Sequence, residues 1–429
     1  MAKLARFVVL AGLLVACSTQ VGFAQIQQGK TVEQWVQQLK DTDTAKRREA
    51  AVALGSFGPD ISKPAIQAMA AALKDKDQNV RHALALSLGN YGPAAKLALD
   101  AIRAAVSDPA PAVRRAAVFA LGNMGVSAKP AVAELIKALS DQSENVRHAA
   151  AYAIGAIGEE AKTAAQALGK VLVNDPDPDV RQSAAFALGE IGPDAAESVE
   201  FLTRALADKD GDVRKSVVEA ISAMGPEAKP AVSALAQVML NDASFAIRRS
   251  AAYALGEMGP EARDASRALG QALRDKDPAV RYDAAQSLST IGPDAKVAVP
   301  ALIQALKDED VEVRKKVLFA LGEMGPSAGN AAAAMGVMLA DPDEDVRKAA
   351  AYALAALGPA AEPAVPALVQ ALGDKVDSVR LAIAYALGEV GDGAASAVPV
   401  LIRFLKDYDD EVRQEVAFAL GEIGSDAKA

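Results

Sequence analysis

The sequence predicts an all-α fold: an α-solenoid, wound as a right-handed superhelix, of twelve stacked two-helix repeats. Two observations predict it. An arginine recurs every 33 or 34 residues, and helix start and stop residues recur with the same period. These arginines are Arg47, Arg81, Arg114, Arg147, Arg181, Arg214, Arg248, Arg281, Arg314, Arg347, Arg380 and Arg413. No insertion interrupts the period, so we expect residues 31–429 to form one array.

The second helix of each repeat is delimited by capping residues. In the eighth repeat, Asp277 is the expected N-cap, Pro278 fits the first turn, and Gly292 is expected to end the helix in the left-handed conformation. We interpret the glycines in general as helix stops. Those followed by proline are Gly58, Gly92, Gly192, Gly225, Gly259, Gly292, Gly325 and Gly358.

The predicted core is an apolar stripe at positions −1, +3, +7 and +10, counted from each repeat's arginine. In the ninth repeat these are Val313, Val317, Leu321 and Met324. Their spacing of four, four and three residues places them on one face of a helix. A single helix pair could not bury this stripe, so the repeats must stack.

The first repeat is predicted to be an end cap. Thr31 and Gln34 have the spacing of a capping box, and the first helix has a polar face. Trp35, the only tryptophan, lies on the opposite face of that helix and is expected in the core.

These motifs resemble those of the HEAT-repeat family, in the regular branch of the HEAT-like repeats of phycobilin lyases. The matching pattern in the ninth repeat is D-E-D-V-E-V-R-K-K-V-L-F-A-L-G-E-M-G, and the resemblance covers Thr31 to Gly424. An aspartate precedes each repeat's arginine by six residues. The resemblance implies that these aspartates and arginines form a hydrogen-bonded ladder between neighbouring repeats. It also implies that the second helices line a concave groove.

The net charge of the protein limits the kinds of molecule that it is expected to bind. Without Lys3 and Arg6 of the expected signal peptide, 44 of the 46 basic residues remain against 55 acidic ones, and the formal net charge changes from −9 to −11. Nucleic-acid binding depends on clustered basic residues that neutralise phosphates, so we expect no nucleic-acid partner. We expect contact with a membrane only through a lipid anchor.

The residues do not predict an enzyme. HEAT-like repeats occur in deoxyhypusine hydroxylase, which uses His-Glu pairs as iron ligands, and in phycobilin lyases. Here His82 and His148 are the only histidines, they lie in different repeats, and each is followed by alanine. We therefore predict no metal site, no cofactor and no catalytic residues. Lyase-like activity on a bilin stays the enzymatic alternative.

One column of residues is not explained by the core. Eight of the eighteen aromatic residues occupy position +5, which helical geometry directs away from the core. These are Phe119, Tyr152, Phe186, Tyr253, Phe319, Tyr352, Tyr385 and Phe418. We call this set the aromatic column. The rings either pack over alanines of the adjacent helix or form a recognition surface, and the two interpretations are compatible.

Two repeats place charges one turn before and after the ring. They are Arg249, Tyr253 and Glu257 in the seventh repeat, and Lys315, Phe319 and Glu323 in the ninth. The sequence thus predicts a scaffold that binds a protein or peptide along its concave face, with these residues and the aromatic column as the site. Polysaccharide is the second candidate ligand.

The amino terminus predicts export, to a bacterial periplasm or cell envelope. Lys3 and Arg6 precede an apolar run from Phe7 to Ala16, which is too short to span a bilayer. A signal peptide is expected over residues 1–24, with a short linker at 25–30. The alternative is a lipoprotein signal over 1–16, which would leave Cys17, the only cysteine, as a lipid anchor.

The two cleavage patterns predict different mature proteins. Lipidation at Cys17 should cause the protein to partition into detergent, and Cys17→Ala should abolish that partitioning because it removes the thiol that is modified. Phase partitioning and amino-terminal sequencing measure this. A water-soluble mature chain that begins at Gln25 would decide for ordinary signal peptidase.

Overall fold

A computed structural model describes residues 26–58 and 61–424 of the chain. Within these residues it contains 24 α-helices, two for each of the twelve predicted repeats. The all-α solenoid is thus confirmed. The expected signal peptide and Cys17 lie outside the described residues. The chain divides into two compact units, Met1–Ala120 and Leu121–Ala429, which we call unit 1 and unit 2.

Unit 1 holds the first two repeats and most of the third. Its elements are β1 (Ile26–Gln27), β2 (Lys30–Thr31), α1 (Val32–Gln38), α2 (Thr44–Leu54), α3 (Lys63–Ala72), α4 (Gln78–Gly89), η1 (Gly92–Ala98), α5 (Leu99–Ala105) and the larger part of α6 (Pro111–Asn123). The η elements are short 3-10 helices that precede the first helix of a repeat.

The start of unit 1 differs from the expected linker over residues 25–30. Ile26 and Gln27 pair antiparallel with Thr31 and Lys30, so β1 and β2 form a two-residue ladder that the sequence did not predict. The turn needs positive φ at both Gln28 (50°) and Gly29 (78°), the geometry of a two-residue hairpin turn. This hairpin covers α1.

Trp35 is buried, as predicted. Its side chain is 1% exposed, and its indole N–H donates a 3.1 Å hydrogen bond to the carbonyl of Gln27. Lys30 places its ammonium 4.2 Å from the ring centroid. The predicted capping box is present, since Thr31 accepts from the Gln34 amide and the Gln34 side chain accepts from the Thr31 amide.

Unit 2 begins inside α6 and continues with nine first helices. These are α7 (Val132–Ala138), α9 (Ala165–Asn174), α11 (Val199–Ala205), α13 (Val232–Asn241), α15 (Ser266–Ala272), α17 (Val299–Ala305), α19 (Ala332–Val337), α21 (Val365–Ala371) and α23 (Val398–Phe404). Each follows a 3-10 segment, and a further one follows α19. The segments are η2 (Gly125–Ala131), η3 (Gly158–Ala164), η4 (Gly192–Ser198), η5 (Gly225–Ala231), η6 (Gly259–Ala265), η7 (Gly292–Ala298), η8 (Gly325–Ala331), η9 (Met338–Ala340), η10 (Gly358–Ala364) and η11 (Gly391–Ala397).

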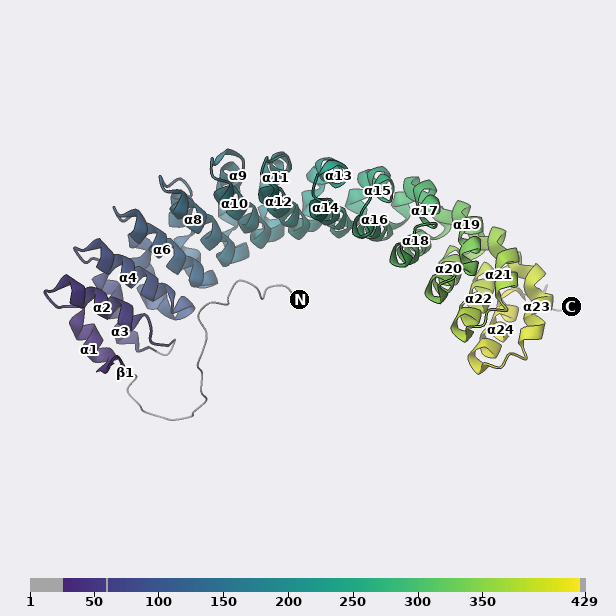
Figure 1. Cartoon of the computed structure of the whole chain (residues 1–429), viewed down its shortest axis with the longest axis horizontal. Helices are drawn as coiled ribbons and strands as arrows, with labels where there is room; N and C mark the ends of the chain where they lie inside the picture. Colours follow the sequence, from purple (N-terminus) through teal and green to yellow (C-terminus); the bar gives the residue numbers. More distant parts are fainter. Residues whose placement is uncertain (1–25, 59–60, 425–429) are drawn as a thin grey trace. The chain divides into compact units, whose positions relative to one another are not determined.

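The second helices of unit 2 lie along the inner side of a curved row. They are α8 (Glu144–Ile157), α10 (Pro178–Ile191), α12 (Gly211–Met224), α14 (Phe245–Glu257), α16 (Pro278–Ile291), α18 (Val311–Glu323), α20 (Glu344–Leu357), α22 (Asp377–Val390) and α24 (Asp410–Glu422). Within this unit Figure 1 shows them on the concave side, with the first helices outside. This arrangement agrees with the expectation from the family.

The helix caps lie mostly at the residues that the sequence predicted, but the conformation of the glycines differs from the prediction. Helix α16 has Asp277 as its N-cap and Gly292 as its C-cap, as predicted. Gly292 has φ 68° and ψ −140°, which is not the left-handed helical conformation but another region that only glycine adopts readily. Gly58 departs further, since it does not have a positive φ and α2 ends earlier, at Leu54.

A second set of glycines, at position +8, lies inside most of the second helices, although Gly55 of this set is the C-cap of α2. Gly322 lies inside α18, where an added Cβ would lie 3.3 Å from the Cα of Ala353 on α20. At Gly189 the corresponding distance to the Cα of Ala220 is 3.1 Å. The interpretation of all glycines as stops is therefore wrong for Gly189 and Gly322. There the missing side chain lets consecutive second helices approach closely.

The predicted apolar stripe forms the core. Val313 is 1% exposed, and Val317, Leu321 and Met324 are 0% exposed. One stretch, Glu344–Ala371, is long and apolar enough to span a membrane by length and composition. It is not a single helix, because α20 ends at Leu357 and Gly358 (φ 58°) turns the chain into η10 and α21. Its apolar character comes from the core stripes of two packed helices.

The arginines and aspartates form the ladder between repeats that the family resemblance implied. Arg248 donates from Nε and Nη2 to both carboxylate oxygens of Asp275, at 2.7 and 2.8 Å. Its Nη1 donates to the carbonyl of Asp242 at 3.0 Å. Ion pairs of this kind join Arg47–Asp75, Arg81–Asp108, Arg147–Asp175, Arg181–Asp208, Arg214–Asp242, Arg248–Asp275, Arg281–Asp308, Arg314–Asp341, Arg347–Asp374 and Arg380–Asp407.

Removing one ladder arginine should destabilise its unit. The Arg248 and Asp275 side chains are only 5% and 11% exposed, so Arg248→Ala would leave a buried carboxylate without its partner. We expect a loss of roughly 3 kcal/mol in the free energy of unfolding, measured by urea denaturation. The control is Arg413→Ala, because Arg413 pairs with the 87% exposed Asp410 and should cost at most about 1 kcal/mol. Equal losses in the two variants would contradict a stabilising ladder.

The ladder should also make the fold sensitive to acid. Burial opposes ionisation of Asp275, but hydrogen bonds from Arg248 and from the Asp277 amide outweigh it and lower the pKa of Asp275. The pKa values of Asp75, Asp108, Asp208, Asp242, Asp374 and Asp407 are lowered too. A carboxylate whose pKa is lowered by folding stabilises the folded protein at pH values above its unfolded-state pKa of about 4. This stabilisation is lost as the pH falls through the pKa of the folded state. Thermal unfolding followed by circular dichroism should show a steep decrease in Tm below about pH 4. A Tm that is unchanged between pH 5 and pH 3 would refute this.

Candidate functional site

The rings of the aromatic column are exposed, as their position predicted, and all of them except Phe119 lie on second helices of unit 2, which line its concave side. All eight rings are between 39% and 60% exposed, whereas the core stripe of the same helices is buried apart from Leu420 in α24. The rings are therefore neither core residues nor free side chains. In unit 1 the groove between α2 and α4 has Val52 and Leu86 at this position instead of aromatic residues.

Rings of consecutive repeats in unit 2 contact each other. Tyr152 and Phe186 stack with centroids 6.0 Å apart and planes 12° apart. Tyr352 and Tyr385 lie 6.3 Å apart at 55°. The Phe186 ring also lies against α8, where a Cβ on Gly155 would come within 3.2 Å of it. These rings therefore pack on one another and, at Phe186, against the preceding second helix, while about half of each side chain stays accessible.

The charges around Tyr253 are engaged within the protein. Arg249 Nε donates to Asp283 of the next repeat at 2.8 Å, and the Asp283 carboxylate is 10% exposed. A hydrogen bond to Glu257 and the negative charge of Glu257 raise the pKa of Tyr253. The donor, ring and acceptor predicted here therefore lie on one helix, but their polar groups already have protein partners.

At the end of unit 2, the carboxylates of Glu389 and Glu415 lie near the rings of the aromatic column. Burial, followed by the charge of Glu389, raises the pKa of Tyr385. Burial and the same Glu389 also raise the pKa of Glu415. Phe418 is the most exposed ring of the column at 60%.

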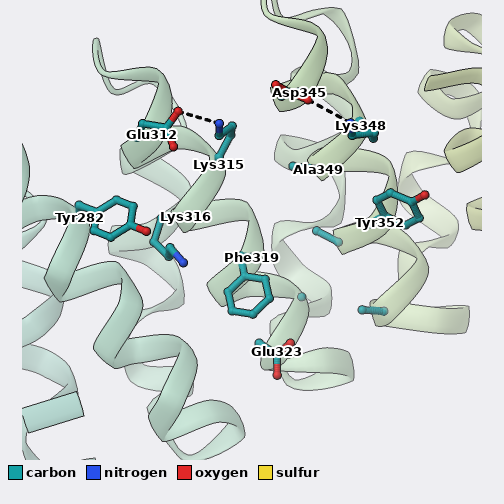
Figure 2. A pocket seen from close by; sticks show the side chains of 13 residues that line it. Tyr282, Glu312, Lys315, Lys316, Phe319, Glu323, Asp345, Lys348, Ala349 and Tyr352 are labelled. Atoms are coloured by element: carbon teal, nitrogen blue, oxygen red, sulfur yellow. Dashed lines mark hydrogen bonds and ion pairs between the residues drawn. The ribbon is translucent and has the colours of Figure 1, made fainter. Parts of the chain in front are cut away.

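The ninth repeat contributes its predicted trio to a pocket. Lys315, Phe319 and Glu323 line a cavity of about 580 Å³ together with residues of α16 and α20, among them Tyr282 and Tyr352. Figure 2 shows the Phe319 ring near the middle of this cavity, with Tyr352 on the α20 side and Glu323 below. We call this cavity the α18 pocket.

Two of the three lysines of the α18 pocket are neutralised by carboxylates on their own helices. Lys315 Nζ lies 2.7 Å from Glu312, and Lys348 Nζ lies 3.0 Å from Asp345. Both pairs lie at the same end of the pocket, where Figure 2 marks them with dashed lines. Lys315, predicted as a donor to the partner, is therefore already paired.

Lys316, which sequence reasoning missed, occupies the space between two rings. Its Nζ lies 4.9 Å from the Phe319 centroid and 5.1 Å from the Tyr282 centroid, both within the range of a cation–π interaction. It donates a 2.6 Å hydrogen bond to Gln286 Oε1. Among residues 26–58 and 61–424, no carboxylate lies within ion-pair distance of Lys316.

The sequence does mark Lys316 and the residues around it, because three of them differ from the residues usual at their repeat positions. Position +2 holds a basic residue only at Lys316, position +1 holds an aromatic residue only at Tyr282, and Gln286 takes a place that an aromatic residue fills in eight repeats. These departures do not by themselves show that the three side chains meet. Tyr282 and Gln286 belong to the eighth repeat, whereas Lys316 belongs to the ninth.

The histidines lie in different places. His82 is partly buried on α4 in unit 1, where desolvation and then Arg115 lower its pKa, and His148 is exposed on α8 in unit 2. In the part of the chain that the structure describes, no group of three or more His, Cys, Asp or Glu side chains is placed to hold a metal ion.

The protein is an α-solenoid, because its two-helix repeats stack in an array. The exposed aromatic and charged residues of the second helices form a candidate binding surface. The sequence matches the family of HEAT repeats over residues 32–101, 99–172, 165–237, 232–299, 299–388 and 365–429. The chain therefore belongs to the HEAT-repeat family. A comparison with curated proteins gave no match.

Solved structures share the fold at low sequence identity. The karyopherin Kap121p bound to the extreme C-terminus of the protein phosphatase Cdc14p is 14% identical with a TM-score of 0.50, over 92% of this chain and 50% of that one. An engineered protein is 23% identical with a TM-score of 0.49, over 92% and 99% of the two chains. The chain thus spans about half the length of Kap121p. These similarities concern the fold.

Proposed function

We propose that this protein is an exported scaffold that binds an extended stretch of another protein along the inner face of its second helices. The observation that carries the proposal is the aromatic column, whose rings are half exposed on the side where charged residues also gather. Half-buried rings offer large, rigid contact area at a low entropy cost, which is why interfaces favour them.

The surroundings of the rings favour a polypeptide over a neutral ligand. The α18 pocket places lysines, carboxylates and rings within one cavity of about 580 Å³, and a polypeptide supplies apolar and charged groups at short intervals. Kap121p, a protein of this fold, was solved bound to the extreme C-terminus of the protein phosphatase Cdc14p. Export rests on the amino-terminal sequence, and a lipid anchor at Cys17 would hold the scaffold at a membrane.

Replacing rings of the column should weaken partner binding. In the variant Phe319→Ala, Tyr352→Ala, Tyr385→Ala, we expect each truncation to cost roughly 2 kcal/mol of binding free energy, because each removes an aromatic anchor. The measurement is affinity capture from envelope extracts by the mature protein, followed by a titration with the captured protein.

The matched control replaces exposed apolar residues away from the second helices. Val126, Val297 and Val337 lie on η2, η7 and α19 and are 48% to 69% exposed. Changing them to alanine should leave capture unchanged, and circular dichroism must stay helical in both variants. Full binding by the ring variant together with a large loss of Tm would mean that the column serves packing alone. Capture of glycans in place of proteins would favour the polysaccharide alternative.

A further inference from the structure

The α18 pocket contains a charge that does not follow the repeat. Lys316 is the only basic residue at position +2. In eight of the twelve repeats that position holds alanine or serine. A single, non-periodic cation identifies one place in the array where a particular group could be recognised.

Two further departures from the repeat, Tyr282 and Gln286, meet the Lys316 ammonium together with Phe319 of the aromatic column. Tyr282 and Phe319 lie on either side of it at 5.1 and 4.9 Å, and Gln286 accepts one of its hydrogen bonds at 2.6 Å. Gln286 interrupts the aromatic column, and the structure supplies a reason: an aromatic ring there could not accept this hydrogen bond. Figure 2 shows the Lys316 side chain lying between Tyr282 and Phe319.

The ammonium keeps donors for a ligand. A lysine ammonium has three N–H donors, and Gln286 uses one. The rings attract the charge but accept no conventional hydrogen bond. Lys315 and Lys348 differ, since Glu312 and Asp345 neutralise them. Lys316 therefore combines an uncompensated positive charge with free donors, and a carboxylate is the group in a polypeptide that satisfies both.

The other end of the same helix offers the opposite charge. Glu323 lines the pocket, is exposed, and has no basic partner within ion-pair distance among the residues that the structure describes. It lies seven residues after Lys316, which is about 10.5 Å along a helix. An extended chain covers this distance in about three residues. Phe319 lies between the two charges, and the Tyr352 ring lies across the groove on α20.

We propose that the α18 pocket binds an extended peptide segment of the partner in one charge order. A glutamate or aspartate side chain binds Lys316, an apolar side chain inserts between Phe319 and Tyr352, and a lysine or arginine about three residues from the acid binds Glu323. This inference rests on the proposed function and adds to it the chemistry of the segment that is recognised. Gln286 and Tyr282 are positioning residues, because they hold the ammonium in place.

The experiment uses the full mature chain and defined probes. One probe is a fluorescent ten-residue peptide of glycine and serine that carries a glutamate, a leucine directly after it and a lysine three residues after the glutamate. In the second probe glutamine replaces the glutamate. Both peptides are acetylated and amidated, so that the side chain is the only carboxylate. Fluorescence anisotropy at low salt gives the two Kd values.

We expect the wild-type protein to bind the glutamate peptide about tenfold more tightly than the glutamine peptide, because a charge-assisted hydrogen bond is lost in the second. Lys316→Met keeps the length of the side chain and should abolish the preference. Lys316→Arg should keep most of it. The matched control from the same pocket is Lys348→Met combined with Asp345→Asn, which removes a neutralised pair without changing the net charge of the pocket and should leave the preference unchanged.

Equal affinity of the wild-type protein for both peptides, or an unchanged preference in Lys316→Met, would overturn the inference. If both peptides then bound through the rings, with Phe319→Ala weakening them equally, the proposed function would still stand. If neither these peptides nor any member of a random peptide library bound, the proposed function would fail together with the inference.

Discussion

The ion pair between each repeat's arginine and the next repeat's aspartate is the interaction on which the architecture depends. A buried guanidinium is costly to desolvate, and this cost is offset only where its donors find well-placed acceptors. Here one carboxylate accepts two of them, and the carbonyl of the repeat's own aspartate accepts another. The aspartate also accepts from the backbone amide two residues later. Each pair therefore links two repeats and fixes the turn before a second helix.

The distance between consecutive second helices is set by a different constraint, the small size of the residue at position +8. Gly189 faces the Cα of Ala220 and Gly322 faces that of Ala353. Serine and alanine at Ser222, Ser289 and Ala355 show that the position needs a small residue, not glycine in every case. This close approach brings position +1 of one repeat next to position +2 of the following one. The pairs Arg249–Asp283 and Tyr282–Lys316 both follow from that offset.

The sequence predicted the fold almost residue by residue but the site only in part. Helix α16 has the predicted caps, and Val317 and Leu321 are fully buried, because capping and helical periodicity act within one helix. The exposed face of the column followed from the same periodicity. Contacts between repeats were beyond this reasoning: the pairing of Arg249 with Asp283 depends on how two helices are rotated against each other. The hairpin at Gln28 and Gly29 was missed because glutamine rarely adopts a positive φ.

Two groups of positions can be distinguished in each repeat. One group holds neighbouring repeats together, and the other borders the solvent-exposed inner face. The ladder arginine, the glycine and the apolar stripe each contact a neighbouring repeat, so changes there propagate along the array. Positions +1, +2 and +5 lie at or beside the open surface. A new residue at one of them alters the groove it borders and leaves the ladder, the small residues at position +8 and the apolar stripe in place. Each groove can therefore diverge in ligand preference on its own, and one chain can present a series of unlike contact points on a uniform frame.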